Sequence, residues 1–329
     1  MSDQAHTRTD RELQELEKRI AKVYQEARDD VTDQIKAYFQ RFQARDTAMQ
    51  KRLAAGEITE EYYKQWRLNQ IGRGRRFEDL RDKLAERFTD AYETAVAYVN
   101  DKTPGIYSLN RNYAAYTIER AVGDVGFTLW DEQTVRRLIV EEPDVMPYYP
   151  PERAVRRGID LAYGKSQITK NVTSSILQGL TVKQMADNLQ ERIATMSRVS
   201  AVRAARTAVT AAENAGRMDS YHAAEKMGIK LRKRWLSTLD GRTRHAHAIL
   251  DGQTADVDKP FKVDGREIRF PGDPQAAPYL VYNCRCTLIA DVKGIPQDDA
   301  LRRDREGIIP DMTFAQWQNT KRGERGLQR

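Results

Sequence analysis

The chain has 329 residues, of which 40% are hydrophobic and 31% are charged, and its mean hydropathy is −0.74. This length allows about two domains with cores that need no cross-links. The absence of a long apolar stretch excludes a multi-span membrane protein and predicts no membrane anchor. The net charge is +7, and residues 201–250 supply most of it, with ten basic and four acidic residues. We therefore expect a local basic patch that could face an anionic partner.

The cysteine content and the first residues indicate the compartment in which the chain folds. Cys284 and Cys286 are the two cysteines, and one residue separates them. They cannot join distant segments, which excludes a disulfide scaffold. The N-terminal residues lack the apolar segment of a secretory signal. We expect folding in a reducing cytoplasm.

The first predicted region, residues 1–105, consists of long helical hairpins. A nearly straight amphipathic helix is predicted over 9–55, because apolar residues recur about every 3.6 positions from Leu13 to Phe42. Further helices are predicted over 60–71 and 77–100. Pro104 and the glycine after it are expected to stop the last of these.

The second region, residues 106–198, is predicted to be a helical linker region. Prolines and tyrosines at 146–151 indicate an exposed connector between short helices. Helices are predicted over 151–164 and 165–178. The next helix runs over 181–196, and the threonine and glutamine at its start have the spacing of a capping box.

The third region, residues 199–294, is predicted to be a small α+β domain. It begins with an alanine-rich helix over 199–227, whose many small side chains favour the helix and allow close packing. A strand over 229–238 and a short helix over 242–250 follow. The fold class is therefore α+β, with a mainly helical N-terminal region followed by a small α+β domain that contains a short sheet or hairpin.

Turn residues organise the end of the third region. Asp264-Gly265 is the strongest hairpin signal in the chain, since both residues tolerate positive φ. A second strand region is predicted over 279–292. The remaining residues, 295–329, form a polar C-terminal tail with one amphipathic stretch near Phe314 and Trp317.

A basic run in the third region is the candidate site for DNA. Alternation along a strand places Lys230, Arg232 and Arg234 on one face, where they could contact phosphates without reading the bases. The alternative is an edge strand that its charges protect against aggregation. The full candidate DNA-binding set is Lys230, Arg232, Lys233, Arg234, Arg242 and Arg244.

Two histidines and the two cysteines form a candidate metal site. His247, Cys284 and Cys286 offer three ligands of the kind that zinc prefers, with Asp240 or His245 as a fourth. The alternative is that the thiols pack as small apolar groups beside a hydrogen-bonded histidine. We expect no cofactor, with zinc as the one candidate.

Ordinary catalytic motifs are absent from the sequence, including a Gly-x-Ser-x-Gly elbow, a phosphate-binding glycine loop and a His-Glu-x-x-His helix. Asp240, Arg242, His245 and His247 could form an acid–base cluster. We favour a structural role, in which Asp240 caps a helix. The chain is therefore predicted not to be an enzyme.

An ordered set of short motifs over residues 165–290 closely resembles the phage head morphogenesis family, the minor head proteins of Mu-like and related tailed phages. In order, these motifs are an Arg-Thr pair, a tryptophan, Asp-x-Arg-Thr-Arg-x-x-His, Asp-Gly and Asn-Cys-Arg-Cys. The matching residues are Arg206, Thr207, Trp235, Asp240, Arg242, His247, Asp251, Gly252, Asn283, Cys284, Arg285 and Cys286.

The resemblance implies a minor capsid protein inside the virion, present in the host cytoplasm during assembly. It implies a portal protein, other capsid components and packaged double-stranded DNA as partners, and a part in packaging or delivery of the DNA. Two further hypotheses stay open. One is a metal-dependent hydrolase or nuclease that uses His247, Cys284 and Cys286, and the other is a portal adaptor that never touches DNA.

Overall fold

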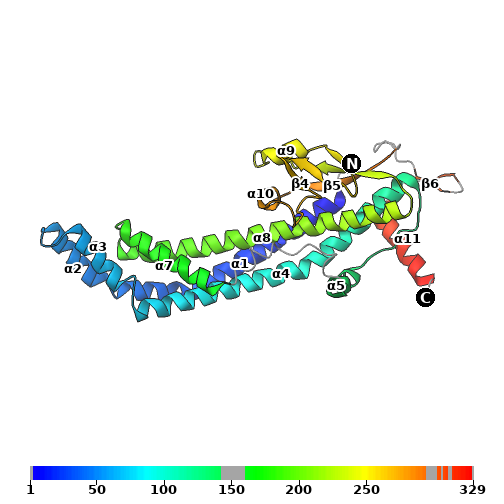
Figure 1. The fold of residues 1–329 in the computed structure, drawn as a ribbon. Helices are drawn as coiled ribbons and strands as arrows, with labels where there is room; N and C mark the ends of the chain where they lie inside the picture. The colour runs from blue at the N-terminus through cyan, green and yellow to red at the C-terminus, as the bar shows by residue number, and fades with distance from the viewer. Residues whose placement is uncertain (1–2, 142–159, 294–301, 305–306, 310–312, 328–329) are drawn as a thin grey trace. The chain divides into compact units, whose positions relative to one another are not determined.

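The structure is a computed structural model that describes residues 3–141, 160–293, 302–304, 307–309 and 313–327 (Figure 1). The predicted connector at 146–151 and most of the predicted helix over 151–164 lie outside the described residues. The helices are α1 (Gln4–Gln40), α2 (Gln43–Ala54), α3 (Glu60–Gln70), α4 (Arg75–Val122), α5 (Glu132–Glu141), α7 (Leu161–Leu177), α8 (Val182–Lys226), α9 (His245–Leu250), α10 (Pro278–Val281) and α11 (Phe314–Leu327). The strands are β1 (Leu231–Leu236), β2 (Thr254–Asp256), β3 (Phe261–Val263), β4 (Arg266–Ile268), β5 (Thr287–Val292), β6 (Arg302–Asp304) and β7 (Gly307–Ile309).

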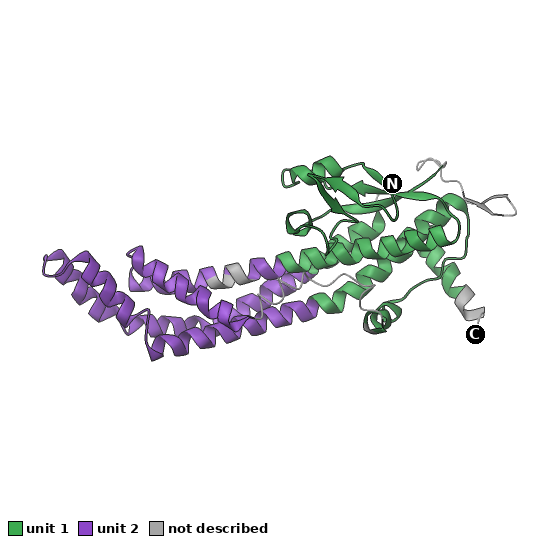
Figure 2. Ribbon diagram, viewed as in Figure 1, with its two compact units in different colours: residues 1–15, 99–151, 203–329 green, residues 16–98, 152–202 purple. Residues whose placement is uncertain are grey.

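The chain forms two compact units, which Figure 2 colours separately. Unit 1 contains residues 1–15, 99–151 and 203–329, and unit 2 contains residues 16–98 and 152–202. The helices α1, α4 and α8 each contribute residues to both units. The fold class is α+β as predicted, with mostly helical structure and a small antiparallel sheet. The predicted domain boundaries stay predictions.

Unit 2 is helical, and its helices bury the apolar stripe that the sequence predicts. On α1, Leu16, Ile20 and Ile35 are buried, in agreement with the 3.6-residue period. The single helix predicted over 9–55 is wrong in one respect. The chain turns after Gln40, and α2 begins at Gln43, so Phe42 at the end of the stripe lies in the turn between two helices.

A buried ion pair fixes α2 against α3 in unit 2. Arg67 on α3 approaches Asp46 on α2 to 3.1 Å, and both side chains are almost fully buried. The Tyr63 hydroxyl donates a hydrogen bond of 2.8 Å to the same carboxylate. The buried carboxylate therefore has a charged and a neutral partner, as an ion inside a protein requires.

Helix α4 continues through Pro104 to Val122, so the predicted stop at this proline is wrong. Proline lacks an N–H and leaves the Asn100 carbonyl without its usual partner. The Thr103 hydroxyl lies 3.5 Å from that oxygen and donates to it. A neighbouring side chain thus supplies the missing donor, which allows the helix to continue.

Two other predicted breaks are also absent. Helix α7 passes through Gly164, although the sequence predicted separate helices on either side. Helix α8 joins the predicted helices at 181–196 and 199–227 into one. Its predicted capping box is confirmed, because Thr181 and Gln184 exchange hydrogen bonds between their side chains and backbone N–H groups. None of the described helices is long and apolar enough to cross a membrane.

The α+β part of unit 1, residues 231–293, is called the lobe below. Its antiparallel sheet has the strand order β2-β1-β5, with β1 in the centre. The strands β3 and β4 form the predicted hairpin, and its turn residues Asp264 and Gly265 both have positive φ. The strand predicted over 279–292 is only partly correct. Residues 278–281 form α10, with Pro278 in its first turn, and β5 begins at Thr287.

The lobe packs on the part of α8 that belongs to unit 1, and glycines permit the close approach. A Cβ at Gly272 would lie 2.6 Å from the backbone nitrogen of Ala211, and its φ is +83°. Gly216 plays the same role between α8 and α4, because a Cβ there would collide with the Tyr107 carbonyl and lie 3.1 Å from the Arg111 nitrogen. Both sites exclude any larger residue without a backbone shift.

The predicted C-terminal tail contains α11, which packs in unit 1. Phe314 and Trp317 are buried against Tyr113 and Tyr116 of α4. The Trp317 indole donates a hydrogen bond of 2.5 Å to Glu119. The prediction of a polar tail over 295–329 therefore does not describe α11, whose aromatic side chains are buried. The structure does not describe the residues on either side of β6 and β7.

Candidate functional site

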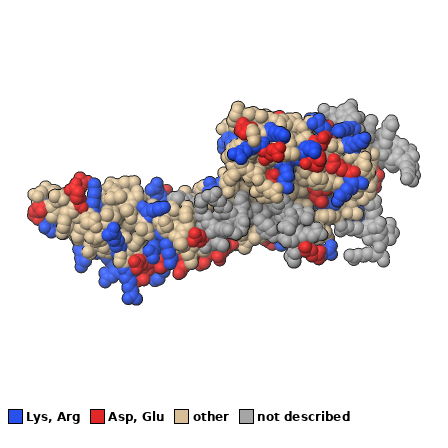
Figure 3. All heavy atoms as spheres, in the orientation of Figure 1, with Lys and Arg blue, Asp and Glu red and all other residues tan. Residues whose placement is uncertain are grey.

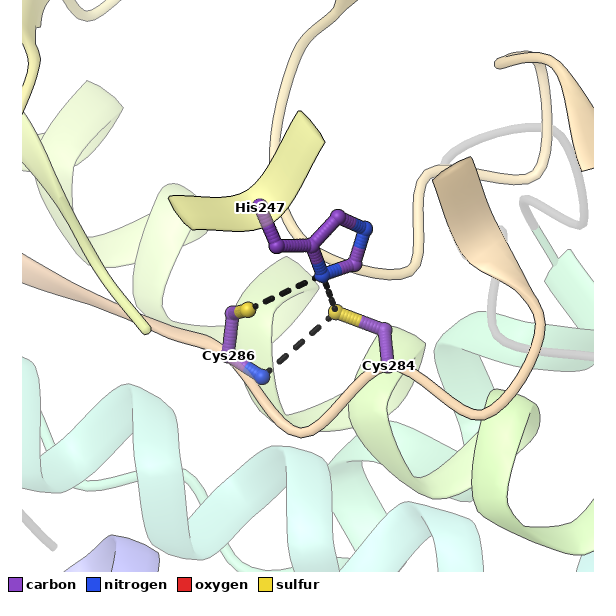
Figure 4. Close-up of side chains that lie close together, drawn as sticks. All are labelled: His247, Cys284 and Cys286. Carbon is purple, nitrogen blue, oxygen red and sulfur yellow. Dashed lines mark hydrogen bonds between the residues drawn. The ribbon is translucent and has the colours of Figure 1, made fainter. Parts of the chain in front are cut away.

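Three residues with metal-binding side chains meet inside the lobe (Figure 4). His247 lies on α9, and Cys284 and Cys286 lie between α10 and β5. The Nδ1 atom of His247 is 3.7 Å from the Cys284 sulfur and 3.3 Å from the Cys286 sulfur. All three residues are buried, with exposed fractions of 2–3%. The sequence thus predicted correctly that these residues belong together.

Hydrogen bonds fix the orientation of the histidine ring. Its Nε2 atom is 2.9 Å from the Leu280 carbonyl, which can only accept, so Nε2 must carry the proton. Nδ1 then has a free lone pair directed at both sulfurs. Arg244 lies 3.2 Å from Nε2, and its other nitrogen donates to the Tyr282 carbonyl at 2.6 Å. In this tautomer the arginine is a neighbour of Nε2 and does not donate to it.

The backbone around the cysteines is held equally firmly. Asn283 has a φ of 54°, a left-handed conformation that turns the chain just before the first cysteine. From α8, Thr210 donates to the Cys284 carbonyl at 2.7 Å, and Asn214 donates to the Cys286 carbonyl at 3.3 Å. The Cys286 N–H donates to the Cys284 sulfur at 3.4 Å.

The two thiols differ in acidity. Burial raises the pKa of Cys284 well above its ordinary value, and the neighbouring Cys286 adds to this increase. The pKa of Cys286 is lowered, because a hydrogen bond from Cys284 favours its thiolate against the effect of burial. In the absence of a metal, the pair therefore favours one thiolate that accepts a hydrogen bond from the other thiol.

The residues present fit a metal ion. One imidazole nitrogen and two sulfurs are the ligand types of zinc sites, and these atoms all lie within 4.8 Å of one another. Neither predicted fourth ligand joins them among the described residues. Asp240 forms hydrogen bonds of 2.6 and 2.7 Å with Arg285, and His245 is exposed at the start of α9.

Several motif residues form the frame of the cluster. Trp235 is fully buried on β1, and its indole donates to the Ser237 hydroxyl at 3.1 Å. That hydroxyl donates in turn to the His247 carbonyl at 2.7 Å. Asp251 accepts the Ser237 N–H at 2.8 Å, and the Gly252 N–H donates to the Trp235 carbonyl at 2.9 Å. These residues position α9 on the sheet.

The predicted acid–base cluster is not assembled. Asp240 accepts two bonds from Arg285 and one of 2.9 Å from the Arg242 N–H, and these contacts keep its pKa low. This is the structural role that the sequence favoured, although the carboxylate holds a turn and the N-cap of α9 is Arg244. His247 lies in the buried cluster and does not contact Asp240.

The remaining motif residues lie at the junction of the lobe and α8. The Thr207 hydroxyl accepts a hydrogen bond of 3.4 Å from the Asn283 N–H. Arg206, one residue earlier on α8, is partly exposed. The motif thus joins the helix to the cysteine segment.

The basic residues of β1 lie on both faces of the strand, with Lys233 on the inner face and Arg232 and Arg234 on the outer face. Lys233 is 1% exposed and points inward with Leu231 and Trp235. Its ammonium donates at 2.9 Å to the carbonyls of Val257 and Arg269, and burial lowers its pKa to about 8. Lys233 therefore does not belong to an exposed DNA-binding face.

The outward-facing cations have acidic neighbours. On β1, Arg234 lies 3.0 Å from Asp291, and Arg232 lies 3.8 Å from Asp256. Arg242 is 3.6 Å from Asp240, and Lys230 is exposed. In Figure 3, basic and acidic atoms alternate over the visible face of the lobe. The local excess of positive charge in the sequence is therefore partly compensated in space.

Sequence reasoning missed a buried network beneath the lobe. Arg217 on α8 lies 2.6 Å from Asp3 and 3.3 Å from Glu213, and it also donates to Asn110 and the Leu288 carbonyl. The signal was present as an Asn-Ala-Gly-Arg run inside an otherwise alanine-rich helix. Charged residues on the inner face of such a helix require partners, which the sequence alone did not identify.

A family comparison assigns this site to a known group. Residues 166–289 match the model of a family described as Phage Mu protein F like protein. Over this segment the chain is similar to the phage head morphogenesis family, as the motifs indicated. The matched segment contains every motif residue that the sequence identified.

Two curated proteins are similar to this chain over longer stretches. Minor head protein GP7 of Bacillus phage SPP1 is 28% identical over 258 residues, which cover 75% of this chain and 79% of that protein. NAD(+)--arginine ADP-ribosyltransferase EFV of Enterococcus faecalis (strain ATCC 700802 / V583) is 28% identical over 227 residues. That match covers 67% of this chain and 46% of the relative, so it corresponds to about half of that protein. No solved structure matches the chain.

Proposed function

We propose that this chain is a minor capsid protein of a tailed phage that acts inside the head. In this proposal it associates with the portal protein and other capsid components, aids head assembly, and takes part in packaging or delivery of the DNA. It is present in the host cytoplasm during assembly and then in the virion. The observation that carries the proposal is the match to a minor head protein over 79% of that protein's length.

The proposed role is structural and not enzymatic. A catalytic metal needs a coordination position that a substrate can reach. The side chains of the His247, Cys284 and Cys286 cluster are 2–3% exposed, which speaks against the hydrolase or nuclease alternative. The transferase activity in the name of the Enterococcus relative belongs to that protein. Incubation of this chain with labelled NAD⁺ and an arginine-rich acceptor should transfer no label, and transfer would contradict the structural role.

Association with the portal is tested in phage heads. Mature heads and procapsids should both contain the protein, and solubilised heads should release it together with the portal protein. A matched sample from a phage that lacks the gene for this protein gives the background. Absence of the protein from both kinds of particle would refute the assignment to the head.

We propose that the outer face of β1, the residue before it and the turn before α9 make a sequence-independent contact with DNA. The candidates are Lys230, Arg232, Arg234 and Arg242, because Lys233 is buried and Arg244 donates to a backbone carbonyl inside the lobe. Four phosphate contacts would give a slope of roughly −3 to −4 for log affinity against log salt. The neighbouring carboxylates should make the measured slope shallower.

The double variant Arg232→Gln with Arg234→Gln tests this contact. We expect the slope with duplex DNA to flatten by about 2, since each lost phosphate contact removes about 1. Lys262→Gln is the matched control, since Lys262 is an exposed cation of the same lobe outside the basic run. An unchanged slope in the double variant would leave a portal adaptor that does not touch DNA.

A further inference from the structure

The cluster of His247, Cys284 and Cys286 has the spacing of a metal coordination sphere. Zn–S distances of about 2.3 Å and Zn–N distances of about 2.0–2.1 Å with tetrahedral angles place nitrogen and sulfur ligands about 3.5–3.6 Å apart. The two nitrogen–sulfur distances in this structure are 3.3 and 3.7 Å. One ion could therefore contact all three atoms with shifts of a few tenths of an ångström.

The surroundings of the cluster are those of a metal ligand set. The Leu280 carbonyl accepts the Nε2 proton of His247, and this bond fixes the tautomer that directs the Nδ1 lone pair toward the sulfurs. Ligand histidines in metal sites commonly donate their second ring N–H to such an acceptor. The Cys286 N–H directed at the Cys284 sulfur stabilises negative charge on that atom.

Charge balance favours the same conclusion. Metal binding would deprotonate both cysteines, and two thiolates in the core carry a charge of −2 that must be compensated. A divalent cation with two thiolates and a neutral imidazole is a neutral assembly. Nitrogen and sulfur ligands in a tetrahedral arrangement select zinc over magnesium and calcium, which prefer oxygen.

We propose that His247 Nδ1, Cys284 Sγ and Cys286 Sγ bind one structural zinc ion that ties α9 to the segment preceding β5. Cys284 and Cys286 come 37 and 39 residues after His247 in the chain, so the ion closes a long loop across the lobe. A water molecule or another small ligand completes the coordination, because no further His, Cys, Asp or Glu joins the group among the described residues. This proposal does not depend on the portal or DNA contacts.

Elemental analysis of the full-length protein, purified under reducing conditions without chelators, tests the proposal. We expect about one zinc per chain. Cys284→Ser and His247→Gln should each lower the zinc content at least tenfold. His245→Gln is the matched control, because this exposed histidine lies two residues away on the same helix, and it should retain the metal.

A second measurement keeps the test valid if the ligand variants fail to fold. X-ray absorption at the zinc edge of the wild-type protein should give two sulfur ligands and one imidazole. Chelation should lower the melting temperature, and added zinc should restore it. A zinc content below a tenth per chain, a Cys284–Cys286 disulfide, a first shell without sulfur, or another metal in stoichiometric amount would each overturn the assignment.

Discussion

The inside and the outside of the lobe use charged residues in different ways. Beneath the lobe, the Arg217 side chain is 2% exposed and contacts two carboxylates, an amide and a carbonyl. On the outer face, Arg232 and Arg234 are more than a third exposed and have one carboxylate neighbour each. Removal of one partner from a buried ion pair lowers the free energy of unfolding strongly, whereas exposed ion pairs contribute little to stability. Five of the twelve motif residues are buried, namely Thr207, Trp235, His247, Cys284 and Cys286, so the recognisable sequence specifies the frame of the lobe in part.

Removal of Arg217 should have the largest effect on stability. Arg217→Ala leaves Asp3 and Glu213 without their buried cation and should lower the free energy of unfolding by about 3–5 kcal/mol. Urea denaturation followed by circular dichroism measures the change. Arg242→Ala is the matched control, since its side chain is 77% exposed, and it should cost less than about 0.5 kcal/mol. Similar costs for the two variants would contradict the contrast between inside and outside.

Alanine substitutions at two glycines distinguish the cost of a steric collision from the cost of a positive φ. Gly272 and Gly252 both have positive φ, but only Gly272 faces the α8 backbone closely enough for a Cβ to collide with it. Gly272→Ala should therefore lower the free energy of unfolding by about 2–4 kcal/mol, and Gly252→Ala by about 1 kcal/mol. Thermal unfolding of both variants gives the comparison. Equal losses would mean that the lobe does not pack tightly on α8.

The buried network should also make stability depend on pH through His6. Burial lowers the pKa of His6, but the Glu213 carboxylate at 2.8 Å raises it more, to about 9, with a smaller contribution from Asp10 and an opposing one from Arg217. Because the folded state favours protonated His6, its contribution to stability is complete below pH 6.5. This contribution is lost as the pH rises through about 9. The expected loss is about 1–2 kcal/mol, since the side chain is 22% exposed.

The measurement is the difference between wild type and His6→Gln across this pH range. A difference is needed because Lys233 titrates in the same range with the opposite sign. Its lowered pKa of about 8 makes the fold more stable as the pH rises through 8 toward 10.5. If the two proteins lose stability in parallel between pH 6.5 and 9, His6 does not carry the effect.

The smallest change in stability is expected on the outer face. Arg232→Gln with Arg234→Gln removes two half-exposed ion pairs and should change the free energy of unfolding by less than about 1 kcal/mol. The same variant is expected to alter the salt dependence of DNA binding. A loss above 2 kcal/mol would show that this face belongs to the frame as well.

The sequence predicted correctly those elements that depend on residues close together along the chain. The apolar period of α1, the capping box at Thr181 and the Asp264-Gly265 hairpin depend on residues within a few positions of one another. The stop at Pro104 was wrong because a side-chain hydroxyl nearby replaces the lost hydrogen-bond partner. This contact is also local, but intrinsic propensity does not include a side-chain hydrogen bond to the helix backbone.

The candidate site was predictable in part. The residue types identified the His247, Cys284 and Cys286 cluster, but the sequence did not indicate that Asp240 and His245 stay outside it. Alternation along β1 already placed Lys233 on the face opposite Arg232, which the burial of Lys233 confirms. The acidic neighbours of the basic residues were not predictable, because Asp256 and Asp291 come from other strands of the sheet.

The helices α1, α4 and α8 belong to both units, which limits how the lobe could be transferred to another protein. A gene segment for residues 199–294 alone would cut α8 and would omit Asp3 and Asn110, which complete the network around Arg217. Transfer of the lobe to another protein therefore requires its supporting helices to travel with it. The relative from Enterococcus fits this expectation, because its similarity covers 67% of the chain, well beyond the motif segment. Continuity of these helices thus sets the smallest segment of the chain that keeps the whole buried network.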